Sequence, residues 1–144
     1  MEDLQKYYQI VEEGIRLAGV DPELCRSQTE GQWNLKRAES DMWIDVWAVE
    51  EEGNTYFQVM SPLVSIPEEN TEAFYRELLD LNYQMVAACF VTFKQGVYVK
   101  ITREVEHLTP EEVMLCLSRV GHYGQIFEGG FKKKFNAGKL EHHD

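Results

Sequence analysis

The segment LLDLNYQMVAACFVTFKQGVYVKI, residues 78–101, contains the transitions that decide the fold. Its first residues have the pattern of the end of an amphipathic helix. A run that is apolar at both odd and even positions follows, and in the last residues apolar and polar side chains alternate strictly. Side chains on one face recur about every 3.6 residues in a helix and every two residues in a strand. The segment therefore predicts a helix ending near Asn82, a strand from Val86 to Phe93, a turn at Gln95-Gly96, and a second strand over residues 97–102.

The N-terminal half shows the same two periodicities. Apolar residues at helical spacing predict a helix over residues 4–18, and the polar stretch 22–31 is typical of a connecting loop. Strands are predicted at 32–37, 42–50 and 55–66, the last two joined by the turn Glu51-Glu52-Gly53-Asn54. Pro62 lacks the N–H that a central strand requires, so we expect this end of the third strand to lie at a sheet edge or at a bulge.

Two further helices complete the pattern. Pro67 and Asn70 introduce a helix whose buried stripe is Phe74, Leu78 and Leu81. The last helix has an N-cap at Thr109, proline in its first turn, and Glu112 in the position that closes a capping box. Gly129-Gly130 is expected to end or break it.

The predicted order is helix, three strands, helix, two strands, helix. This order is typical of an α+β domain, in which helices pack on an antiparallel sheet. A chain of 144 residues is the size of one compact domain. We expect residues 1–130 to form that domain and residues 131–144 to be a basic-aromatic C-terminal tail.

Composition narrows the possible partners and compartments. The 25 acidic and 14 basic residues give a formal net charge of −11, which repels nucleic acid and anionic membrane surfaces. No apolar run approaches the roughly 20 residues of a membrane-spanning helix, and the N-terminus lacks the pattern of a secretory signal. Three widely spaced cysteines do not indicate a disulfide framework. We therefore expect a soluble, cytoplasmic protein.

Two predicted strands are apolar on both faces. In the strand at 42–50, Met42, Ile44, Val46 and Ala48 share one face, and only Asp45 interrupts the apolar residues of the other. In the strand from Val86 to Phe93, one face has Val86, Ala88 and Phe90. The opposite faces of the two strands together supply Trp43, Trp47, Val49, Cys89, Val91 and Phe93.

An antiparallel sheet needs only one buried face. The second apolar face must therefore be covered by the chain's own helices, by a second copy of the chain, or by a ligand or partner peptide. Its six apolar residues are the candidate partner or dimer surface.

No catalytic or metal-binding pattern is present. The histidines do not have the spacing of metal ligands, there is no C-x-x-C, and the adjacent His142-His143 falls in the expected tail. A nucleophile elbow and a phosphate-binding glycine loop are also missing. Cys89 lies in an apolar strand, where burial raises a thiol pKa and makes the sulfur inert. We predict that the protein is not an enzyme and has no cofactor and no metal site.

Residues 74–120 resemble the YbjN-type family of small bacterial proteins, which are similar in fold to class I type III secretion chaperones. The resemblance rests on LLDLN at 78–82, on the hairpin that follows, and on LTPEE at 108–112. It implies a chaperone-like α+β fold that is commonly dimeric and binds partner proteins across hydrophobic patches.

We accordingly predict a non-enzymatic protein-binding module, chaperone-like or regulatory. It would engage a partner protein or a second copy, as a homodimer, through the apolar sheet face. The alternative is a small regulatory domain that binds a small-molecule or signalling ligand in a pocket beneath the helices.

Overall fold

A computed structural model describes residues 3–37, 39–138 and 140. In chain order the elements are α1 Gln5–Leu17, the 3-10 turn η1 Pro22–Leu24, β1 Gln32–Arg37, β2 Ser40–Val49, β3 Asn54–Ser65, α2 Thr71–Gln84, β4 Cys89–Phe93, β5 Gly96–Glu104 and α3 Pro110–Phe135. Apart from the short η1, this is the order that the sequence predicted. Within the described ranges, none of the helices is both long and apolar enough to cross a membrane.

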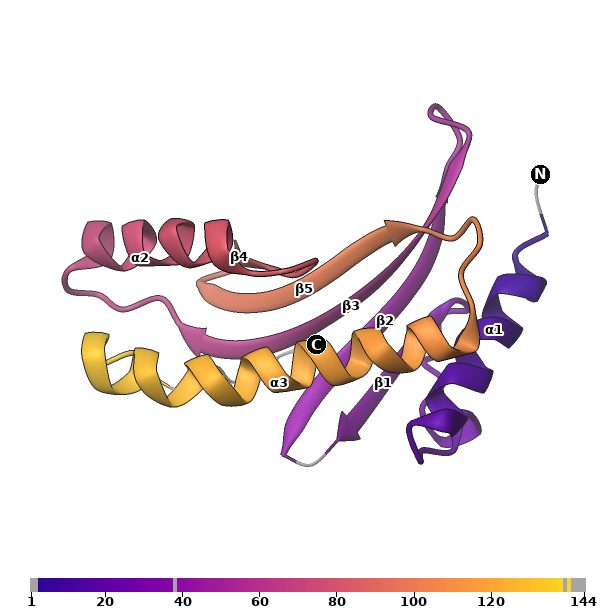
Figure 1. The fold of residues 1–144 in the computed structure, drawn as a ribbon, viewed down its shortest axis with the longest axis horizontal. Coiled ribbons are helices and arrows are strands. Elements are labelled where there is room, and N and C mark those ends of the chain that lie inside the picture. Colours follow the sequence, from indigo (N-terminus) through magenta and orange to yellow (C-terminus); the bar gives the residue numbers. More distant parts are fainter. Residues whose placement is uncertain (1–2, 38, 139, 141–144) are drawn as a thin grey trace.

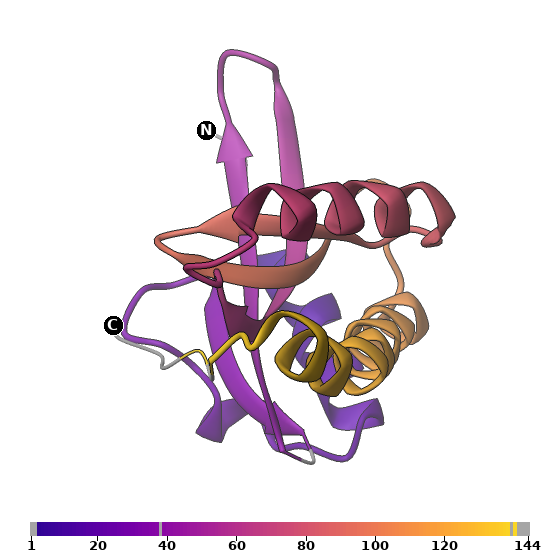
Figure 2. The ribbon, with the colours of Figure 1, turned by 90° about the vertical axis from the view of Figure 1, so that its left-hand side faces the viewer.

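The strands form one antiparallel sheet in the order β1-β2-β3-β5-β4. Figure 1 shows α3 running along one face of this sheet, with α1 beside its beginning and α2 near β4. The view in Figure 2 shows the β2–β3 hairpin projecting beyond the rest of the sheet. Pro62 lies in the central strand, where the register shifts between Pro62 and Val64. The predicted bulge is therefore present, and the edge alternative was wrong.

The core lies between α3 and the face of the sheet that carries Ile44, Val59 and Val99. All three side chains are fully buried, as are Val113 and Leu117 of α3. Strand alternation places Met42 and Val46 on the same buried face, as the sequence predicted.

Helix α3 is longer than the sequence predicted. It continues through Gly129 and Gly130 to Phe135, and Asn136 ends it in the left-handed conformation at φ 52°. Each glycine lowers helix stability by about 1 kcal/mol relative to alanine, but the next turn buries Phe131 to 3% exposure. The first residues of the expected tail are therefore helical. Lys139 and residues 141–144, which include His142-His143, lie outside the described residues.

The strand predicted from Val86 begins only at Cys89. Val86 is 63% exposed and Ala87 has φ 64°, so the chain turns between α2 and β4. Asn82 does not end the helix, which continues to Gln84. Its side-chain amide instead accepts a hydrogen bond from Phe90 N at 2.7 Å and donates one to Phe90 O at 3.2 Å. These bonds attach α2 to β4.

Candidate partner-binding surface

The six residues singled out from the sequence lie on one face of the sheet, opposite the face that packs on α3. We call this the outer face. Strand alternation and register place three of them on β2 and three on β4: Trp43, Trp47, Val49, Cys89, Val91 and Phe93. Phe93 is 52% exposed, and the other five are half-buried. Neither indole is sealed in the core, and Cys89 is only half-buried, which corrects the prediction of a buried thiol.

The aromatic rings of the outer face form contacts across strands. Trp43 lies 5.5 Å from Tyr98 between ring centroids, and Phe93 lies 6.3 Å from the same tyrosine. Further along the sheet, Trp47 lies 5.7 Å from Tyr56. The outer face therefore has two aromatic regions, one around Tyr98 and one around Trp47.

Tyr98 is a member of this surface that the sequence did not identify. Its place in the alternating strand 97–102 indicated a solvated side chain, yet it is only 6% exposed. Its neighbours explain the difference, because Tyr98 pairs across the strands with Pro62 and with Val91. The strand register that creates this environment joins residues far apart in the chain, so alternation alone does not reveal it.

A polar row separates the two aromatic regions. Register places Asp45 opposite Gln32 on β1 and opposite Gln58 on β3, and Gln58 is in turn opposite Thr102 on β5. The side-chain oxygen of Gln58 accepts hydrogen bonds from Thr102 at 2.9 Å and from Lys100 at 3.4 Å. Burial raises the pKa of the Asp45 carboxyl above its ordinary value.

The C-terminal segment reaches one end of the outer face. Ser65 N donates to Gly138 O at 3.0 Å, and Gly138 N donates to the Ser65 hydroxyl at 3.2 Å. Beyond this point Leu140 lies against Gly96, where an added Cβ would be 2.7 Å from a Leu140 methyl carbon. The chain's own C-terminal segment thus contributes to covering the region around Tyr98.

Helix α2 carries a second exposed apolar feature, which we call the α2 stripe. It consists of Tyr75, Leu79 and Tyr83, which are 40%, 69% and 93% exposed. Spacing of four residues puts them on one side of the helix. The sequence predicted only the buried stripe of this helix. The exposed stripe has the same helical spacing, so periodicity is the signal that indicates it.

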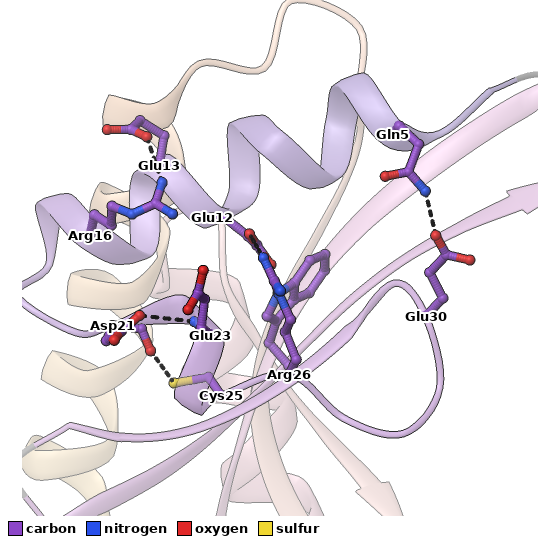
Figure 3. Close-up of polar contacts among 10 residues, drawn as sticks. Gln5, Glu12, Glu13, Arg16, Asp21, Glu23, Cys25, Arg26 and Glu30 are labelled. Carbon is purple, nitrogen blue, oxygen red and sulfur yellow. Dashed lines mark hydrogen bonds and ion pairs between the residues drawn. The ribbon is translucent and has the colours of Figure 1, made fainter.

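Around α1, the polar side chains are bonded to one another (Figure 3). Arg26 donates hydrogen bonds to the two carboxylate oxygens of Glu12 at 2.6 and 2.7 Å, and Trp33 Nε1 donates to the same carboxylate at 3.0 Å. The hydrogen bonds from Arg26 are the main reason why the pKa of Glu12 lies below its ordinary value. Gln5 also donates to Glu30. These contacts attach the loop after α1 to the helix, and the polar groups they use are already paired.

A cavity lies where α1 begins beside the β2–β3 hairpin. Its lining includes Tyr8 and three carboxylates, Asp3, Glu30 and Glu50. Burial, together with the nearby charges of Glu30 and Asp3, raises the pKa of the Tyr8 phenol. In the described part of the chain, no three His, Cys, Asp or Glu side chains are grouped so as to hold a metal ion.

Comparisons with known proteins identify the fold. No family model matches the chain, and no curated protein matches it by sequence. The structure is similar to a chain of the crystal structure of the ExsC–ExsE complex, with a TM-score of 0.67 and 15% identity over 94% of this chain and 97% of that one. It is also similar to a chain of the HopA1–SchA chaperone–effector complex, with a TM-score of 0.67 and 8% identity over 90% of this chain and 99% of that one. These likenesses cover nearly the whole chain and show that it has the α+β fold of these chains.

Proposed function

We propose that this chain is a cytoplasmic, non-enzymatic protein-binding module of chaperone type, which holds a segment of a partner protein against the outer face. The observation that carries the proposal is the aromatic group on the side opposite α3, in which the half-buried Trp43 and the exposed Phe93 flank the buried ring of Tyr98. Contiguous apolar surface of this kind in a small domain marks an interaction site. The fold likeness to a chain of a chaperone–effector complex supports the same proposal.

The charge and chemistry of the outer face suit an extended peptide segment. Its two aromatic regions lie on either side of the polar row, so alternate apolar side chains of one segment would contact both. Aromatic residues are enriched among the side chains that dominate protein–protein binding energy. We therefore expect Trp47 and Phe93, one from each region, to contribute strongly to partner binding.

The test is capture of the partner from the native host with the full chain as bait. Trp47→Asp and Phe93→Asp each introduce a charge at a side chain that is at least partly exposed. Proteins held by the wild type should be lost from both variants, while circular dichroism and melting temperature stay close to wild type. Leu24→Asp is the matched control, because Leu24 is 85% exposed and lies in η1.

Two results would contradict this proposal. One is equal capture of the same protein by the wild type, Trp47→Asp and Phe93→Asp. The other is loss of the folded state in both variants, which would show that these side chains belong to the core.

A homodimer is a second proposal, and the α2 stripe favours it. Three large side chains that are exposed on one helix face forfeit part of the roughly 1.5 to 3 kcal/mol that full burial of each would contribute. Two copies related by a two-fold axis would bury both stripes against each other. Light scattering coupled to size exclusion should give twice the chain mass for the wild type and the single mass for Leu79→Glu. A wild type that stays monomeric at high concentration would refute the homodimer.

A further inference from the structure

Asp45 occupies an unusual position in the outer face. It lies on β2 between Trp43 and Trp47, two residues from each, so all three side chains project from the same side of the strand. Its cross-strand neighbours are the uncharged Gln32 and Gln58. A half-buried carboxylate thus has an indole on either side along the strand and an amide on either side across it.

Within the described residues, the Asp45 side chain has no hydrogen bond and no ion pair. Neither of the lysines near it in the sheet register forms an ion pair with Asp45: Lys36 lies 3.9 Å from Asp41, and Lys100 donates a hydrogen bond to the side-chain oxygen of Gln58 at 3.4 Å. An ionised group that is partly withdrawn from water and has no counter-charge is unfavourable. The raised pKa of Asp45 reflects that loss of solvation. A cation placed beside Asp45 would remove this penalty.

We propose that the partner segment carries an arginine or lysine side chain, which pairs with Asp45 between the indoles of Trp43 and Trp47. The inference rests on the proposed function, since it specifies what the outer face recognises. The basic group would donate hydrogen bonds to the carboxylate. Its cationic charge would also be attracted to the faces of the flanking indoles. The net charge of −11 favours the approach of a basic segment.

The experiment uses a phage-displayed library of random peptides, selected on the full chain. Parallel selections use Asp45→Asn and Asp41→Asn. Asp41→Asn is the matched control, because it makes the same change on the same strand and face, at a carboxylate that already lies 3.9 Å from Lys36. We expect arginine or lysine to be enriched at one peptide position on the wild type and on Asp41→Asn, and the enrichment to be much weaker on Asp45→Asn.

One selected peptide is then synthesised with its basic residue and with a neutral replacement of similar shape, citrulline for arginine or norleucine for lysine. Calorimetric titration should show a dissociation constant about tenfold higher for the neutral peptide on the wild type. On Asp45→Asn the difference between the two peptides should shrink to the smaller contribution of the indoles. This double comparison isolates the contact with Asp45 from the rest of the peptide.

The other outcomes separate the two proposals. Peptides that lose binding to Trp47→Asp but show no basic preference that depends on Asp45 would overturn this inference and leave the proposed function intact. A selection without binders, or binders that are indifferent to Trp47→Asp and Phe93→Asp, would count against both.

Discussion

Replacing Phe131 by alanine tests whether the last turns of α3 belong to the core. Phe131 is 3% exposed, and its ring lies 5.6 Å from Phe74, 5.4 Å from Phe90 and 5.9 Å from Phe127 between centroids. Full burial of a phenylalanine contributes roughly 1.5 to 3 kcal/mol, and the cavity left by truncation adds to the loss, for a typical total of about 3 to 5 kcal/mol. Because Phe131 lies near the end of the helix, where neighbours can relax, we expect about 3 kcal/mol.

Urea unfolding of the wild type and Phe131→Ala would measure this difference by linear extrapolation. For a chain of this size, about 3 kcal/mol corresponds to a melting temperature lower by roughly 6 to 12 °C. Ile126→Ala is the matched control, because Ile126 is on the same helix but 51% exposed, and we expect a change below about 1 kcal/mol. A loss below about 1 kcal/mol for Phe131→Ala as well would refute the docking of this helix end.

Three further predictions concern helices α1 and α3. The pKa of Glu12 is lowered in the folded protein, so its contact with Arg26 stabilises the fold above the unfolded-state pKa and loses that effect as pH falls through the lower folded-state pKa. Glu12→Gln should therefore be less stable than the wild type in urea at pH 7, and this difference in stability should vanish in acid. A difference that does not depend on pH would contradict this origin. At Gly14 an added Cβ would lie 2.4 Å from Val113 Cβ, so Gly14→Ala should lower the free energy of unfolding by about 1 to 3 kcal/mol or more. Gly129 lies in open space on α3, so Gly129→Ala should raise the free energy of unfolding by up to about 1 kcal/mol. Equal effects of the two substitutions in thermal melts would argue against close contact between α1 and α3. The Thr109 hydroxyl accepts a hydrogen bond from Glu112 N at 3.2 Å, so Thr109→Ala should lower the free energy of unfolding by about 1 kcal/mol. Thr109→Ser keeps the hydroxyl and should retain most of that stability. An unchanged melting temperature for Thr109→Ala would show that the cap is dispensable.

Some boundaries could not be predicted from the sequence because tertiary contacts override local preference. Gly129-Gly130 is a pair of poor helix formers, and only the aromatic environment of Phe131 explains why the helix passes through it. Conversely, Val86 follows a helix in an apolar run that suited a strand, but Asn82 already bonds the backbone of Phe90 and the chain turns before β4. An apolar run by itself does not distinguish a strand from a connection beside one.

By itself, the sequence determined the order of helices and strands, the capped start of α3, and the two-sided character of β2. These are local properties, because side-chain periodicity and end caps involve residues only a few positions apart. Only the tertiary structure decided that Tyr98 joins the outer face and is buried there, and that Asp45, among the described residues, has no ion pair between its two flanking indoles. These properties depend on the register of strands distant in the chain, which short-range periodicity does not specify.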